Sequence, residues 1–89
     1  MTWRDYAARI AKAFDVSLDE LLGRSNAHAF THPRQALYLL LHVKNQWGAT
    51  MIGRRIGRDH GTVSAGIRTA RHRLLKDGDF AARYEAAAS

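Results

Sequence analysis

Residues 52–74 contain two apolar series that a glycine and an aspartate separate. Ile52 and Ile56 are four positions apart, and the second series recurs at spacings of four, three and four: Val63, Ile67, Ala70 and Leu74. Such spacings place apolar side chains on one face of a helix. Gly57 is suited to end the first helix, and Asp59 is suited to cap the second. The stretch therefore predicts a short helix, a tight turn and a longer helix, which is the helix-turn-helix arrangement.

The N-terminal part of the chain carries the same helical periodicity. Its apolar residues recur at spacings of three and four along one stripe: Trp3, Tyr6, Ala7, Ile10, Ala11 and Phe14. Ser17 and Glu20 have the spacing of a capping box, and Gly23 is a natural stop for the short helix that this box begins. Residues 24–32 have no period, so they predict an exposed loop in which Phe30 points inward.

A third helix is expected after this loop, because Pro33 suits the first position of a helix and Thr31 or His32 can cap it. The apolar face of this helix is broad: Ala36, Leu37, Leu40, Leu41, Val43 and Trp47. Gly48 is expected to end the third helix, and Thr50 is expected to cap the fourth.

The dipeptide Asp77-Gly78 predicts a break, followed by a last helix that contains Phe80, Ala81 and Tyr84. No strand-like alternation occurs anywhere. The predicted fold is therefore all-α, a compact bundle of five to six helices in a single domain over residues 1–89. The helix-turn-helix is expected at about residues 50–76, and a basic loop at about residues 24–32.

Charge is distributed unevenly along this chain of 89 residues with a net charge of +6. Residues 24–76 hold ten Lys and Arg residues, all five histidines and only one acid, Asp59. A basic cluster of this kind favours a polyanionic partner such as nucleic acid. The chain has no cysteine, no apolar run long enough to span a bilayer and no apolar signal-peptide core near its start, so a cytoplasmic, nucleoid-associated protein is predicted without a membrane partner.

The second helix of the helix-turn-helix begins with short polar side chains that can approach base edges in a major groove: Asp59, His60, Gly61, Thr62 and Ser64. Arginines surround that end of the helix and can meet phosphates: Arg54, Arg55, Arg58, Arg68, Arg71 and Arg73. Gly61 and Gly66 inside the helix each lower its stability by roughly 1 kcal/mol relative to alanine. They are explained equally well by close packing of helices and by close approach to DNA.

Three segments in this order, "VSLDELLGRS", "HPRQALYLLLHV" and "MIGRRIGRDHGTVSAGIRTARHRL", resemble the C-terminal DNA-binding domain of the bacterial replication initiator DnaA. The resemblance covers roughly residues 5–76 and is most specific at "PRQ" (33–35) and "GRDHGTV" (57–63). It implies a helical bundle with a helix-turn-helix, a basic loop ahead of the third helix and double-stranded DNA as the ligand. It further implies base-reading roles for Asp59, His60 and Thr62, and phosphate-backbone roles for the residues Arg34, Gln35 and Thr50.

Departures from the family pattern alter these expectations. Gly61 stands where the family usually has a second threonine, which predicts the loss of a methyl contact to thymine. Asn26 stands where the family has an arginine that enters the minor groove. Arg24 and His28 flank it, so minor-groove recognition is expected to be weakened or altered. The chain also contains no Gly-rich Walker-type loop, so by itself it is not expected to act as an ATP-driven initiator.

Other classes of function are less well supported by the residues. Asp59 and His60 are adjacent, so in a helix they point about 100° apart, which is a poor geometry for shared catalysis. The remaining histidines lack nearby thiolates or carboxylates in a metal-binding pattern. No catalytic residue, metal site or cofactor is therefore predicted.

The sequence thus predicts a sequence-preferring protein that binds double-stranded DNA through base-reading residues Asp59, His60, Gly61 and Thr62. Its predicted backbone contacts are Arg34, Gln35, Thr50, Arg54, Arg58, Arg68 and Arg71. The favoured role is a stand-alone transcriptional regulator that binds as a monomer, with a protein of the replication or transcription machinery as a further partner. The alternatives are a regulator of replication initiation, a protein-interaction module with weakened DNA binding, and a nonspecific nucleoid-like protein.

Overall fold

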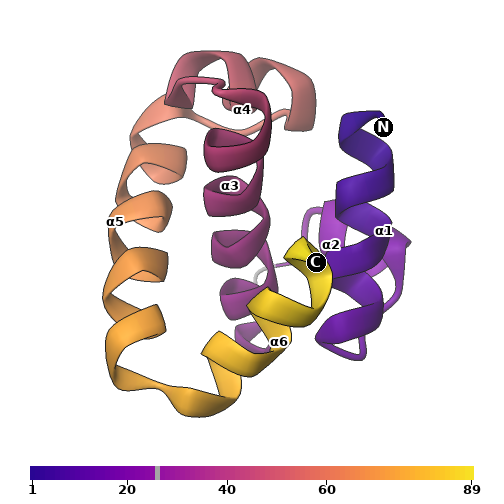
Figure 1. Ribbon diagram of the computed structural model, residues 1–89. Helices are drawn as coiled ribbons and strands as arrows, with labels where there is room; N and C mark the ends of the chain where they lie inside the picture. Colours follow the sequence, from indigo (N-terminus) through magenta and orange to yellow (C-terminus); the bar gives the residue numbers. More distant parts are fainter. Residues whose placement is uncertain (26) are drawn as a thin grey trace.

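The computed structural model describes residues 1–25 and 27–89, so Asn26, one of the predicted minor-groove residues, lies outside the described residues. The described residues form six α-helices and one 3-10 turn, η1, and they contain no strand (Figure 1). In chain order the elements are α1 Trp3–Ala13, α2 Leu18–Leu22, η1 His28–Phe30, α3 Thr31–Asn45, α4 Ala49–Ile56, α5 His60–Lys76 and α6 Gly78–Ala88. The predicted all-α bundle is confirmed.

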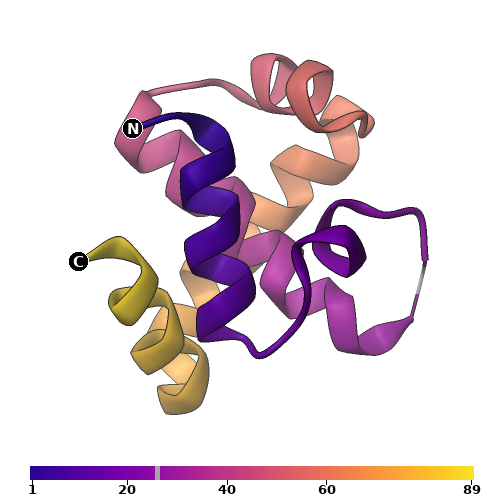
Figure 2. The same cartoon turned by 90° about the vertical axis from the view of Figure 1, so that its right-hand side faces the viewer.

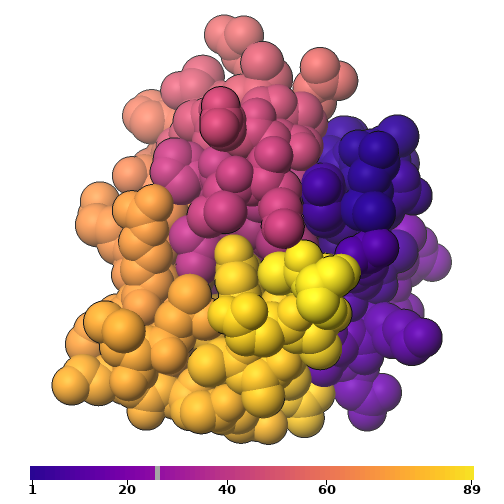
Figure 3. All heavy atoms as spheres, in the orientation of Figure 1, coloured from indigo at the N-terminus to yellow at the C-terminus, as the bar shows by residue number. Residues whose placement is uncertain are grey.

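Helix α3 forms the centre of the molecule and packs against α1, α4, α5 and α6. Leu37, Leu39, Leu40 and Leu41 in its middle are each at most 2% exposed, so this helix is buried around nearly its whole circumference. Figure 2 shows α1 crossing over α3 with α6 beside it. In the space-filling view, α5 lies along the left margin and α1 at the right, with α6 between them (Figure 3). Helices α5 and α1 therefore lie on opposite sides of α3, and α4 lies across the top of the molecule in this view (Figure 1).

Local capping explains where several helices begin. Ser17 and Glu20 form the predicted capping box of α2. The side chain of Asp77 accepts a hydrogen bond of 3.1 Å from the backbone N–H of Phe80 and so caps α6. Thr2 and Asp5 form a further capping box at α1, which was not predicted. Hydrogen bonds from Thr2, above all from its backbone N–H, lower the pKa of the Asp5 carboxyl below its usual range.

The predicted start of the third helix was wrong by two residues. Helix α3 begins at Thr31 directly after η1, so Pro33 occupies its third position. Neither Thr31 nor His32 caps it, because the residue before the helix is Phe30, which makes no side-chain capping bond. Proline is tolerated throughout a first turn, where backbone N–H groups have no partner within the helix. The irregular part of the predicted loop is correspondingly shorter.

The junction between α3 and α4 also differs from the prediction. Helix α3 ends at Asn45, and Gln46 rather than Gly48 reverses the chain, with a φ of 56° in the left-handed region. The Nδ1 of His42 bonds the carbonyl oxygen of Trp47 at 2.8 Å and holds this reversal. Gly48 precedes α4 in an extended conformation, so Thr50 is the second residue of α4 and not its cap.

Among the described residues, no helix combines the length and the apolarity that crossing a membrane requires.

Candidate nucleic-acid interface

Two glycines close the turn between α4 and α5. Gly57 has a φ of 81°, a conformation that side chains other than glycine rarely adopt. The backbone N–H groups of Gly57 and Arg58 both donate to the carbonyl oxygen of Gly53, at 2.8 and 2.9 Å. A Cβ atom on Gly53 would collide with the carbonyl oxygen of Arg58. The predicted helix-turn-helix is therefore present, and its close turn requires glycine in the first helix as well as at its end.

Asp59 caps α5 as predicted. Its Oδ2 accepts hydrogen bonds from the backbone N–H groups of Gly61 at 3.0 Å and Thr62 at 3.3 Å. Its Oδ1 lies 3.9 Å from Nδ1 of His60, and both side chains are 73% exposed. One carboxylate oxygen thus fixes the start of the helix, while the other oxygen and the imidazole face solvent.

The four predicted base-reading residues lie together at the exposed N-terminal end of α5: Asp59, His60, Gly61 and Thr62. The buried stripe of the same helix faces α3 and is formed by Val63, Gly66, Ile67 and Ala70. The two glycines within α5 now have different explanations. A Cβ on Gly66 would lie 2.6 Å from Cδ2 of Tyr38, so Gly66 serves helix packing. Gly61 is exposed, and a Cβ there would lie 2.9 Å from the capping Oδ2 of Asp59.

Three of the predicted phosphate-binding arginines are exposed and available: Arg54, Arg68 and Arg71. No described residue accepts a hydrogen bond from any of their guanidinium groups. Thr50 is also exposed, in the first turn of α4, where no side chain caps the helix. Arg55 differs, because its guanidinium carbon lies 5.6 Å from the centre of the Trp47 ring. Thr50 and Arg54 thus lie on the helix that precedes α5, and Arg68 and Arg71 lie along α5 beyond its N-terminal end.

Arg34 occupies a different environment from these arginines. Its guanidinium group donates to the backbone carbonyl oxygens at and beyond the end of α2, from Glu20, Leu21, Gly23 and Ser25. The Nη2 of Arg58 also donates to the carbonyl oxygen of Gly23. Two of the predicted phosphate contacts are therefore engaged with the protein backbone, a result that the sequence alone did not indicate.

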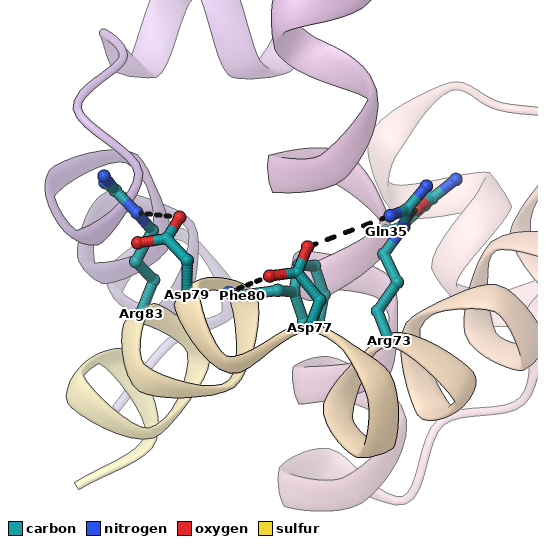
Figure 4. A network of polar contacts seen from close by, with 6 residues as sticks. All are labelled: Gln35, Arg73, Asp77, Asp79, Phe80 and Arg83. Carbon is teal, nitrogen blue, oxygen red and sulfur yellow. Dashed lines mark hydrogen bonds and ion pairs between the residues drawn. The ribbon is translucent and has the colours of Figure 1, made fainter.

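Gln35, another predicted backbone contact, is bound from α5. Its Oε1 accepts a hydrogen bond of 3.3 Å from Nε of Arg73, whose Nη1 lies 4.0 Å from Oδ2 of Asp77 (Figure 4). The same figure shows Asp77 at the start of α6 directed toward both Arg73 and Phe80. Arg73 is thus part of the connection between α3, α5 and α6.

A groove of about 540 Å³ lies between the N-terminal halves of α3 and α5. Its walls carry hydroxyl, amide, guanidinium and small side chains: Thr31, Arg34, Gln35, Tyr38, Arg58, Thr62, Ala65, Gly66 and Thr69. Burial raises the pKa of Tyr38, and the positive charges of Arg58 and Arg34 act in the opposite direction. Tyr38 and Thr69 were not predicted as site residues. The spacing of Thr62, Gly66 and Thr69, which puts small side chains on one helix face, is the signal that would have indicated a close neighbour there.

The loop ahead of α3 presents Arg24 and His28, both exposed, whereas Asn26 lies outside the described part of the chain. The ring of His28 lies edge-on to that of His32 with centroids 5.9 Å apart, and His32 in turn lies 6.5 Å from the Phe80 ring. Burial lowers the pKa of His32, and the charges of Arg73 and His28 add to this effect. The 3-10 turn is thereby connected to α6 through an aromatic contact. Phe30 is only partly buried, with the Arg34 guanidinium carbon 5.5 Å from its ring centre.

Comparison with known proteins identifies the family to which this domain is related. The helix-turn-helix of bacterial DnaA proteins matches residues 7–70. The chain is 34% identical over 70 residues to the chromosomal replication initiator protein DnaA 2 of Chlamydia caviae, which covers 79% of this chain and 15% of the relative. It is 33% identical over 75 residues to the chromosomal replication initiator protein DnaA of Methylacidiphilum infernorum, covering 82% of this chain and 16% of the relative.

The matches to these relatives span less than one fifth of the relatives' length. The family match includes all of α4 and α5 as far as residue 70. The all-α fold, the tight turn at Gly57 and the exposed polar end of α5 are consistent with a helix-turn-helix domain of this family. The chain belongs to the DNA-binding helix-turn-helix family of the bacterial DnaA proteins.

Proposed function

We propose that the protein binds double-stranded DNA with sequence preference, and that it regulates transcription without catalytic activity of its own. The observation that carries the proposal is the N-terminal end of α5, where Asp59 fixes the helix and His60 is 73% exposed. In helix-turn-helix proteins this end of the second helix enters the major groove. A neutral imidazole there can donate and accept hydrogen bonds at base edges.

Exposed groups on α4 and farther along α5 suit contacts to the phosphate backbone. Arg54, Arg68 and Arg71 are exposed and have no acceptor among the described residues. The first turn of α4 leaves backbone N–H groups for an anion, and the Thr50 hydroxyl lies beside them. These groups are expected to set affinity and its salt dependence, while α5 sets the choice of sequence.

A role in replication initiation is the second candidate, because the relatives that cover most of the chain are named chromosomal replication initiators. The DNA-reading domain serves either role in the same way, since both require recognition of a defined duplex. The roles differ in where the preferred sequences occur in a genome. Mapping of occupied sites by crosslinking and sequencing separates them: sites at promoters support transcription, whereas sites confined to a replication origin support the second candidate.

We further propose that the domain contacts DNA as a monomer and associates with the nucleoid through that contact. A protein of the transcription or replication machinery is the expected additional partner. Sedimentation of the protein with one duplex that carries the preferred sequence tests the stoichiometry, and a 2:1 complex would contradict the monomer.

The experiment that tests sequence preference is selection of bound sequences from a random duplex pool at about 150 mM salt. Electrostatic attraction alone enriches no motif at this salt concentration. The wild type is expected to enrich a motif that His60→Ala loses in part. His72→Ala is the matched control, because His72 is an exposed histidine about 18 Å farther along the same helix. No motif with the wild type would contradict the proposal, as would an equal effect of both substitutions.

A further inference from the structure

Arg34 and Arg58 donate to the same oxygen atom, the backbone carbonyl oxygen of Gly23. Arg34 lies near the start of α3, and Arg58 lies in the turn between α4 and α5. Gly23 directly follows α2 and opens the loop that leads to η1. Figure 2 shows this loop and the turn of the helix-turn-helix on the same side of the molecule. One carbonyl oxygen therefore joins three segments that are distant in sequence, and we call this set of hydrogen bonds to Gly23 the joint.

Arg34 is largely committed to this joint. A guanidinium group has five N–H donors. Nε donates to Leu21 at 2.9 Å, and Nη2 donates to Glu20 at 2.8 Å and to Gly23 at 3.0 Å. Nη1 donates to the carbonyl oxygen of Ser25, which leaves one donor for any other acceptor. The final carbonyl groups of a helix have no partner within it, so Arg34 satisfies the end of α2.

The arrangement brings two positive charges together. Burial lowers the pKa of Arg34, and the charge of Arg58 lowers it further. The two like charges repel each other, and the carbonyl oxygens that accept their hydrogen bonds offset that repulsion. The exposed arginines of the same surface, such as Arg54, point into solvent and have no such constraint. The convergence of Arg34 and Arg58 is therefore a specific feature of the fold.

We propose, on the basis of the DNA-binding function above, that Arg34 and Arg58 are positioning residues. Through the carbonyl oxygen of Gly23 they fix the loop that carries Arg24 and His28 at a defined place relative to α5. The contacts made by the loop and those made by α5 then meet the DNA at a fixed spacing from each other. Rigid placement before binding reduces the ordering entropy that association would otherwise require. This role differs from the phosphate contact that the family resemblance implies for Arg34.

The first test is the salt dependence of binding to the selected duplex. Arg58→Ala is compared with Arg54→Ala, a matched control nearby whose guanidinium is exposed. A phosphate contact contributes about one unit to the slope of log Kd against log salt. Arg54→Ala is expected to lower the slope by about one and to weaken all sequences alike. Arg58→Ala is expected to raise Kd for the preferred duplex on the order of tenfold with the slope unchanged. A slope lowered by about one in Arg58→Ala would overturn the proposal.

The second test measures the joint without DNA. The carbonyl carbon resonance of Gly23 is expected to move in Arg58→Ala and to stay in place in Arg54→Ala, because Arg58 donates to that oxygen and Arg54 does not. An unchanged Gly23 resonance in Arg58→Ala would overturn the proposal. If the wild type enriches no DNA motif, the proposed function fails, and this measurement still reports whether the joint exists.

The third test uses a charge-conserving variant. Lysine keeps the charge of Arg34 but has no planar fork to reach several carbonyl oxygens at once. Arg34→Lys is therefore expected to lose sequence preference at the base pairs nearest the loop and to keep it at those under α5. Retention of the full motif in Arg34→Lys would indicate a phosphate contact and overturn the proposal. Thermal unfolding by circular dichroism selects folded variants, and Arg58→Lys replaces Arg58→Ala if alanine prevents folding.

Discussion

The two ends of α5 treat their polar side chains in opposite ways. At the N-terminal end, His60 is 73% exposed, and Asp59 uses only one carboxylate oxygen to cap the helix. At the C-terminal end, Arg73 binds Gln35 of α3 and lies 4.0 Å from Asp77, which caps α6 (Figure 4). The polar groups at one end are therefore free for a ligand, while those at the other hold three helices together.

This difference shows how a domain of 89 residues combines stability with recognition. The C-terminal end of α5 leads into Phe80, which is 2% exposed and lies against Phe14 with ring centroids 5.5 Å apart. The N-terminal end is held by backbone bonds to Gly53 and by its cap. Substitutions at the C-terminal end of α5 are thus expected to change the free energy of unfolding, and substitutions at its N-terminal end to change DNA binding.

The largest effect is expected from Phe80→Ala. Removal of a buried phenylalanine leaves a cavity and lowers the free energy of unfolding by about 3 to 5 kcal/mol. Urea unfolding followed by circular dichroism measures this change, and Phe80→Leu serves as the control that keeps most of the buried volume. The sequence preference of the folded fraction is expected to persist. A loss of less than about 1 kcal/mol would contradict the role of this end as the anchor.

His60→Ala is expected to reduce discrimination between the preferred duplex and a mismatched one by about 1 to 3 kcal/mol, the contribution of a good base contact. Fluorescence anisotropy with both duplexes measures this difference. The thermal unfolding midpoint is expected to stay unchanged, because the side chain is 73% exposed. A shifted unfolding midpoint together with unchanged discrimination between the two duplexes would contradict a role of the N-terminal end of α5 in DNA binding.

The two capping aspartates allow a direct comparison of the ends. Loss of an N-cap typically lowers stability by about 1 kcal/mol, and we expect this for both Asp59→Ala and Asp77→Ala. Only Asp59→Ala is expected to weaken binding to DNA as well. Denaturation and anisotropy of both variants provide the measurements. Asn variants at both positions keep a capping oxygen and serve as the controls. Weaker DNA binding by Asp77→Ala than by Asp59→Ala would contradict the assignment of DNA binding to the N-terminal end of α5.

The smallest effect concerns pH at the anchored end, where His32 contacts Phe80. Burial, Arg73 and His28 lower the pKa of His32 in the folded protein below 6.5, whereas Asp77 acts in the opposite direction. The unfolded chain therefore binds this proton at a higher pH than the folded chain does. The free energy of unfolding is expected to fall as the pH drops from about 6.5 through the lowered pKa.

Proton NMR titration of the imidazole signals measures the pKa of His32 directly. His28→Gln removes one of the neighbouring charges, so the pKa of His32 is expected to rise in this variant. A pKa of His32 at or above its ordinary value in the wild type would contradict the expectation. His32→Asn is the control for stability, because its free energy of unfolding lacks this contribution over the same pH range.

Much of the fold was predictable because its determinants are local. The Ser17 and Glu20 capping box acts within four residues, and the sequence located it. The cap formed by Asp59 was predicted in the same way. At Asp77-Gly78 the sequence predicted only a break, whereas the structure shows that Asp77 caps α6. The start of α3 was missed, since a proline is compatible with several positions of a first turn. The left-handed conformation of Gln46 was missed as well, because glycine two residues later was the more typical residue for it.

The candidate site divides along the same line. The exposed cluster at the N-terminal end of α5 follows from helical periodicity, since residues that do not face the core face solvent. The roles of Arg34, Arg58 and Gln35 did not follow, because their partners lie on other elements. A long side chain reaches many places, and only the packing of the helices decides which acceptor lies within its range.

The sequence by itself determined the helices, the caps formed by Ser17 and Asp59, the tight turn at Gly57 and the polar face at the start of α5. Each depends on side chains and backbone groups that are neighbours along the chain. The tertiary structure alone decided that Gly66 packs against Tyr38 and that the Gly23 carbonyl oxygen accepts from Arg34 and Arg58. The physical reason is that such contacts require helices distant in sequence to meet at a specific place, which the burial of the whole apolar core around α3 enforces.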